Sequence, residues 1–85
     1  MLGMMIGELA ARTRLPVREL RFHADAGVLP EVGRNESGYR LFDAGAVARA
    51  RLVRTLRELG FGLDDMKFVI ALELFYRRGR APVDW

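Results

Sequence analysis

The 85-residue sequence predicts one small, mainly helical domain of four helices and a short two-stranded β-hairpin. Three observations predict this fold class. Apolar residues recur at helical spacing in four segments. Glycine or proline stands near the boundaries of most of these segments. Between the second and third helical segments, a turn cluster separates two short runs of residues, which indicates a hairpin. Because 51% of the residues are apolar, the chain can build a single compact core.

The first two helices are expected over residues 6–12 and 16–26. Pro16 suits the start of the second helix, because proline is tolerated at the first helical position. Gly27 is a typical residue to end it. Only about three residues separate the two segments, so they form a candidate helix-turn-helix.

Residues 31–42 are expected to form the hairpin. The sequence Asn35-Glu36-Ser37-Gly38 is a turn cluster, and Gly38 is expected to adopt a positive φ angle. Tyr39–Phe42 has strand propensity. A two-stranded hairpin is marginal by itself, so it must pack against the helices.

The third and fourth helices are expected over residues 44–59 and 63–78. Asp43 is a good candidate to cap the third helix with its side chain. Gly60 ends that helix, and the short connection that follows includes Phe61, which is expected in the core. Residues 1–78 should therefore form one domain, followed by a short tail over 79–85.

Composition excludes several classes of protein. There is no cysteine and a single histidine, so disulfide frameworks, zinc fingers and multi-histidine metal sites are not expected. No apolar stretch is long enough for a membrane helix, and the N-terminus does not resemble a secretory leader. We expect a cytoplasmic protein without a cofactor. No carboxylate pair, nucleophile–base set or phosphate-binding loop indicates an enzyme.

Basic residues are concentrated in two short segments. The chain has 14 Lys plus Arg against 11 Asp plus Glu, and all the basic residues except Lys67 are arginine. Arginine suits recognition of phosphates and base edges, because its planar group donates two parallel hydrogen bonds. A genomic preference for arginine codons would raise the count as well, so position matters more. The two clusters are Arg12, Arg14, Arg18 and Arg21, and Arg49, Arg51, Arg54 and Arg57; the second is expected to be mostly solvated.

Five segments, in the right order and spacing, resemble the N-terminal DNA-binding domain of the MerR family of bacterial transcription regulators. The resemblance implies a winged helix-turn-helix fold, in which the hairpin is the wing. It also implies sequence-specific binding of double-stranded DNA, at the bacterial nucleoid, by a regulator of transcription. The segments are Ile6–Ala10, Val17–Phe22, Ala26–Pro30, Asn35–Arg40 and Leu56–Leu63.

The resemblance also implies which residues contact DNA. The helix over 16–26 would lie in the major groove, where Arg18 can bridge guanine O6 and N7. The wing over 31–42 would lie on the phosphate backbone. Two alternatives stay open: Arg21 pairing with a neighbouring acid, and the ring of Tyr39 packing under the hairpin. The candidate DNA-binding residues are Arg12, Arg14, Arg18, Arg21, Phe22, His23, Arg34, Tyr39 and Arg40.

The recognition helix departs from the family pattern at several positions. The family has two tyrosines where this chain has Phe22 and His23, and a Glu-Arg pair where it has Ala24 and Asp25. Asp25 reverses a charge near the expected DNA face, so the affinity of one domain for DNA should be low. For His23, a half-buried neutral ring remains an alternative to DNA contact. Arg14 stands where glycine is common in the family.

The last helix is apolar on more than one side. One stripe, Met66, Val69, Ile70 and Leu74, suffices for the core, which leaves a second stripe as a candidate partner or dimer interface. The partner would be a second copy, assembled cooperatively on DNA, or an unlike protein. Alternatively, the tail covers this stripe with Val83 or Trp85. The second stripe is Phe68, Leu72, Phe75 and Tyr76.

Two other functions fit the same scaffold. The chain could be a protein-interaction module, such as an antirepressor or anchoring factor, that uses the apolar helix over 66–76. It could also be a DNA architectural factor of the excisionase type. Weak DNA binding together with tight binding of a protein would favour the first, and bending of the duplex would favour the second.

Overall fold

The computed structural model describes residues 3–79 and confirms the predicted plan of four helices and a two-stranded hairpin. Every helix starts and ends within one residue of its expected position. The tail expected over 79–85 lies almost entirely outside the described residues, so the domain boundary stays a prediction. The elements are α1 (Ile6–Thr13), α2 (Val17–Asp25), β1 (Gly33–Arg34), β2 (Arg40–Leu41), α3 (Gly45–Glu58) and α4 (Leu63–Gly79).

The turn between α1 and α2 is fixed by a buried threonine. The hydroxyl of Thr13 donates to the carbonyl oxygen of Leu9 at 2.9 Å and accepts the backbone N–H of Leu15 at 3.2 Å. Arg14 ends α1 in the left-handed region, at φ 64°, and its N–H bonds the carbonyl oxygen of Ala10. These contacts set the angle at which α2 leaves α1.

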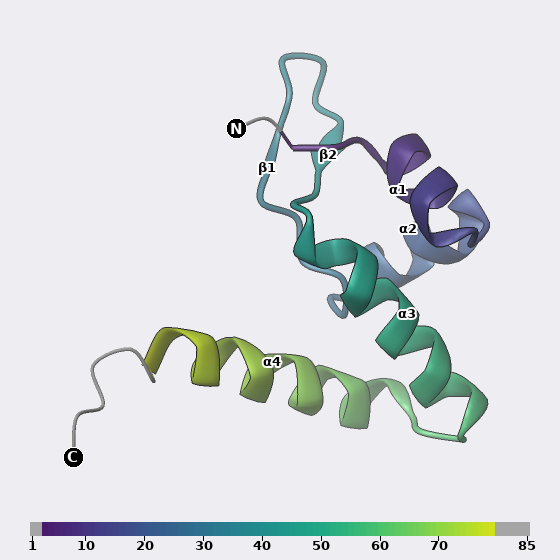
Figure 1. Cartoon of the computed structure of the whole chain (residues 1–85), viewed down its shortest axis with the longest axis vertical. Coiled ribbons are helices and arrows are strands. Elements are labelled where there is room, and N and C mark those ends of the chain that lie inside the picture. Colours follow the sequence, from purple (N-terminus) through teal and green to yellow (C-terminus); the bar gives the residue numbers. More distant parts are fainter. Residues whose placement is uncertain (1–2, 80–85) are drawn as a thin grey trace.

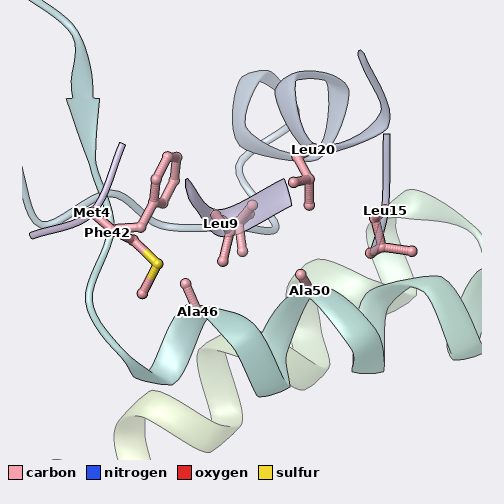
Figure 2. Close-up of a cluster of buried hydrophobic side chains, with 8 residues drawn as sticks. Met4, Leu9, Leu15, Leu20, Phe42, Ala46 and Ala50 are labelled. Atoms are coloured by element: carbon pink, nitrogen blue, oxygen red, sulfur yellow. The ribbon is translucent and has the colours of Figure 1, made fainter. Parts of the chain in front are cut away.

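The main core lies where α1, α2, the start of α3 and the base of the wing meet (Figure 2). Leu9 and Leu20 are fully buried and bring the inward faces of α1 and α2 together. Phe42, just after β2, is also fully buried and joins the wing to this core. The buried cluster comprises Met4, Leu9, Leu15, Leu20, Leu29, Phe42, Ala46 and Ala50.

The wing is an antiparallel hairpin that projects away from the helices (Figure 1). Gly38 has φ 87° in its turn, as expected. The N-terminal segment supports the hairpin through a bridge in which Met4 and Phe42 exchange two backbone hydrogen bonds of 2.8 Å. This third segment stabilises the hairpin, because an isolated two-stranded ribbon is only marginally stable in water.

The expected side-chain cap of α3 was wrong. Ala44 occupies the capping position with helical backbone angles, and no side chain caps the helix. Asp43 contributes its backbone carbonyl oxygen instead, which accepts the N–H of Ala46 at 3.0 Å. Because the chain is already helical at Ala44, the Asp43 carboxylate stands outside the position that a capping side chain occupies.

After the loop that follows α3, the helix α4 turns back and diverges from α3, running away from α1 and α2 (Figure 1). Met66 and Ile70 bury its inward face against Val28 and Val53, as the core stripe predicts. The side chain of Leu74, placed in the same stripe, lies outside the described residues. Among the residues described, no helix has the length and apolar character needed to cross a membrane.

Candidate nucleic-acid interface

Two arginines lie on the outer face of α2 near its start. The inward face of the helix is fixed by Leu20, which is fully buried, so Arg18 and Arg21 are turned to solvent. Within residues 3–79, neither guanidinium has a hydrogen-bonded or ionic partner. The carboxylate of Glu19 lies 3.9 Å from Arg54 on α3 and Asp25 pairs with Arg40, so the alternative in which these acids neutralise Arg21 is not observed.

An open hollow of about 340 Å³ lies between α2, the N-terminal segment and the wing. Tyr39 is 61% exposed, so its ring does not pack under the hairpin. Arg21 reaches the hollow from α2, and the wing lines the opposite side. The arrangement brings together three guanidiniums and a phenol hydroxyl, all donors that suit phosphate oxygens. The lining residues are Met5, Ile6, Arg21, Arg34, Gly38, Tyr39 and Arg40.

The two wing arginines are paired with acids. Nη2 of Arg40 lies 2.6 Å from Oδ1 of Asp25, and its Nε lies 3.0 Å from Oε1 of Glu31. Nε of Arg34 lies 3.0 Å from Oε2 of Glu31, and its Nη1 donates to the carbonyl oxygen of Gly38 at 3.2 Å. The hydrogen bond from Arg34, with the positive charge of both arginines, lowers the pKa of Glu31. The hydrogen bond to Asp25 is the main cause that raises the pKa of Arg40.

His23 does not belong to the exposed face, which corrects the expectation of DNA contact. It follows the buried Leu20 by three residues, so helical geometry turns its ring inward, where it is fully buried. Among the residues that the structure describes, neither ring nitrogen has a hydrogen-bond partner, and the Glu19 carboxylate lies 3.9 Å from Nε2. Burial lowers the pKa of His23; the Glu19 carboxylate opposes this shift and the Arg57 guanidinium adds to it.

The remaining candidates, Arg12, Arg14 and Phe22, differ in whether their side chains are free to contact DNA. Arg14 is exposed at the turn before α2. Arg12 is also exposed but pairs with Glu8 at 2.9 Å, one turn earlier on α1. The ring of Phe22 is 46% exposed, and the guanidinium of Arg57 lies 5.5 Å from its centre, within range of a cation–π contact.

Two expectations about the later part of the chain were wrong. Arg49 belongs to the cluster expected to be mostly solvated, yet its side chain is only 6% exposed and pairs with Glu73 at 2.9 Å. Its guanidinium lies on the side of α3 that faces α4. There the carboxylate of Glu73, instead of water, accepts its hydrogen bonds. Phe61, which is expected in the core, is 43% exposed, because the loop after Gly60 (φ 95°) carries its ring outward.

Known proteins share this architecture. A family model described as MerR HTH family regulatory protein matches residues 4–72. The chain belongs to the MerR family. The resemblance drawn from five short segments is thereby confirmed, and so is the winged helix-turn-helix fold. MerR proteins are a family of regulators, and the match spans all the elements from the N-terminal bridge to most of α4.

Among its relatives, the chain is 35% identical over 82 residues to the HTH-type transcriptional regulator HmrR of Rhizobium leguminosarum bv. viciae. That alignment covers 95% of this chain and 60% of HmrR. It is 39% identical over 62 residues to the nodulation protein NolA of Bradyrhizobium sp. (strain NC92), covering 73% of this chain and 26% of NolA. The chain thus spans about a quarter to three fifths of the length of these relatives.

Solved structures in the family superpose on the chain. HiNmlR, a MerR family regulator lacking the sensor domain and solved bound to promoter DNA, gives a TM-score of 0.69 at 28% identity and covers 88% of this chain and 59% of its own. PbrR691 from Ralstonia metallidurans CH34, solved in complex with lead(II), gives 0.71 at 31% identity and covers 95% and 59%. The arrangement of α2 and the wing is therefore one that MerR regulators share.

Proposed function

We propose that the chain binds double-stranded DNA sequence-specifically and acts as the DNA-reading part of a transcription regulator. The helix α2 enters the major groove, and the wing over 31–42 lies on the adjacent backbone. The observation that carries this proposal is the exposed pair Arg18 and Arg21 on the outer face of α2, neither with an acidic partner in the described chain. The structure of HiNmlR on promoter DNA supports it by similarity.

Arg18 is the residue that reads bases. It is the second residue of α2, and the N-terminal residues of a recognition helix meet base edges first. An arginine there can donate two hydrogen bonds to guanine O6 and N7, a pairing that no other base offers in the major groove. Guanine should therefore be required at the base pair that Arg18 faces.

Backbone contacts come from the hollow beside α2. Arg21 lines this hollow from the helix, and Tyr39 and Arg34 line it from the wing. A phosphate group seated there would accept hydrogen bonds from the hydroxyl and the guanidiniums, which fixes the register of α2 in the groove without reading sequence. Arg14 adds positive charge at the preceding turn, and Arg12 adds less because it is paired with Glu8.

The apolar face of α4 supports a second role, in assembly. Phe68 and Phe75 are 67% and 69% exposed, and Leu72 and Tyr76 are 44% and 62% exposed in the single chain. Such a row of large apolar side chains is costly in water and is typical of a surface that another protein covers. We propose a second copy of the chain as the occupant, so that two reading heads act on one DNA site. Leu72→Glu should then leave the fold intact and abolish the larger species in size measurements.

Methylation interference tests the DNA proposal. Genomic duplexes selected by the protein are methylated at guanine N7, which lies in the major groove, or at adenine N3, which lies in the minor groove. We expect N7 methylation at one or more guanines of the selected site to block binding, because it removes the acceptor that Arg18 uses. Binding that is insensitive to every N7 methylation would exclude major-groove reading by α2.

A further inference from the structure

One ion pair joins the recognition helix α2 directly to the wing. Asp25 is the last residue of α2, and Arg40 is the first residue of β2. The 2.6 Å contact between them spans 15 positions of the sequence. The side chain of Asp25 is 58% exposed and that of Arg40 is 27% exposed, so the pair lies at the edge of the hollow that the wing shares with Arg21.

The charges around this pair cancel. Asp25 and Glu31 supply two negative charges, and Arg34 and Arg40 supply two positive ones. Glu31 is shared between both arginines, whereas Asp25 contacts Arg40 alone in this group. Together, these four side chains add no net charge to the surface that is expected to face DNA.

The pair competes with phosphate for the same cation. Nη2 of Arg40 can pair closely with only one of the two anions, so a phosphate contact from Nη2 comes at the expense of the 2.6 Å contact with Asp25. A phosphate entering the hollow must either draw Arg40 from Asp25 or approach a carboxylate that repels it. In either case, the Asp25 carboxylate lowers the affinity that contacts between the wing and the DNA backbone contribute.

We propose that Asp25 is a positioning residue that holds Arg40 on α2 and thereby limits the contribution of the wing to DNA binding. This inference rests on the proposed function. Its consequence is selectivity: the wing adds little affinity for arbitrary DNA, so discrimination depends on the base contacts of Arg18. A chain without the carboxylate would bind all duplexes more tightly, so arbitrary DNA would retain more of the protein.

A double-mutant cycle tests the proposal. The variants are Asp25→Asn, Arg40→Gln and the double variant, with affinity measured on a selected duplex and on a random duplex over a range of salt. We expect Asp25→Asn to tighten binding of the random duplex about eightfold at 0.1 M salt and to steepen the slope of log affinity against log salt by about 0.9, the value for one added phosphate contact. The gain on the selected duplex should be no larger.

The double variant decides the mechanism. If Asp25 acts by holding Arg40, adding Asp25→Asn to the Arg40→Gln chain changes affinity by less than about twofold and leaves the salt slope unaltered. If the full gain persists without Arg40, Asp25 acts only as a negative charge near DNA, and the proposal is overturned. Equal thermal midpoints for all four chains would confirm that folding is not the cause.

Elution from immobilised heparin separates this inference from the proposed function. Heparin is a polyanion without base pairs, so it senses an Arg40 guanidinium released from Asp25, though still paired with Glu31, even if the chain reads no DNA sequence. We expect Asp25→Asn to elute at higher salt than the wild type, and the double variant to elute with Arg40→Gln. Failure of all chains to bind duplex would remove the proposed function, whereas unchanged heparin elution of Asp25→Asn would remove this inference alone.

Discussion

The guanidinium of Arg49 on α3 donates two hydrogen bonds to one carboxylate oxygen of Glu73 on α4, from Nη2 at 2.9 Å and from Nε at 3.3 Å. Arg49 is almost fully buried, while the Glu73 side chain is 35% exposed. The apolar contact beside this pair is small, comprising Met66 and Ile70 on α4. The ion pair therefore adds a second connection between α3 and α4 beside the apolar contact.

Breaking this pair should destabilise the domain. Glu73→Ala leaves the buried Arg49 cation without that carboxylate, and we expect the free energy of unfolding to fall by about 2 kcal/mol, reduced from the fully buried case because Glu73 is partly exposed. The double variant Arg49→Met/Glu73→Leu should recover most of the loss, since apolar residues can replace a buried pair. Urea unfolding measures both. A double variant no more stable than Glu73→Ala would contradict this view.

The buried ring of His23 should make stability depend on pH. Its folded pKa is lowered, chiefly by burial, so the unfolded chain takes up a proton at a higher pH than the folded chain does. Stability is therefore complete above the unfolded value of about 6.5 and is lost as pH falls below it, by at most about 1.4 kcal/mol per pH unit for one proton. The groups facing the ring are Glu19 on its own helix and Arg57 on α3.

Thermal unfolding between pH 7.5 and 5.5 measures this dependence. His23→Phe keeps an inward ring without a titrating group, so its midpoint should vary less over the same range than that of the wild type. A wild-type midpoint that is flat, or that rises on acidification, would show that Glu19 stabilises the charged ring at least as much as burial opposes it.

The turn between α1 and α2 should gain stability from glycine. Arg14 has φ 64°, a conformation that costs an L-residue about 1–2 kcal/mol. Glycine adopts it freely but orders at a larger entropic cost, so we expect Arg14→Gly to stabilise the domain by about 0.5–1 kcal/mol. Arg14→Ala removes the same charge without relieving the strain and is the matched control. Equal stability of the two variants would refute the strain argument.

The sequence predicts most of the fold because the determining signals are local. The periodicity of α1 to α4, the turn at Gly38 and the breaks at Gly27 and Gly60 each depend on a few neighbouring residues. The inward direction of His23 could have been read in the same way, since it follows Leu20 by three positions. Its polar type argued for the surface, and tertiary burial overrode that preference.

The pairing of charges could not be predicted in this way. Asp25 and Arg40 are 15 positions apart, and Arg49 and Glu73 are 24 apart, so no helical spacing links either pair. Their contacts depend on how the wing is oriented against α2 and how α4 is oriented against α3. A cluster of arginines in the sequence therefore shows where positive charge is concentrated, but not which guanidiniums remain free for a ligand.

Arg18 and Arg21 should differ in what they contribute to binding. Arg18→Ala should weaken binding of a selected duplex by about 10- to 100-fold, and binding of a random duplex much less, because a bidentate base contact supplies about 1–3 kcal/mol of discrimination. Arg21→Ala should weaken both by a similar factor, as a phosphate contact does. Titrations by fluorescence anisotropy compare the two variants. Equal losses on both duplexes for Arg18→Ala would reassign it to the backbone.

The dependence of affinity on salt tests the central claim most directly. A chain that places Arg14, Arg18 and Arg21 on DNA, with further donors from the wing, should release about as many counterions as it neutralises phosphates. We expect log affinity for a selected duplex to fall with log salt at a slope of roughly −3 to −5. A slope near zero, or no binding at low salt to any duplex in a genomic pool, would contradict the assignment of α2 and the wing as a DNA-reading surface.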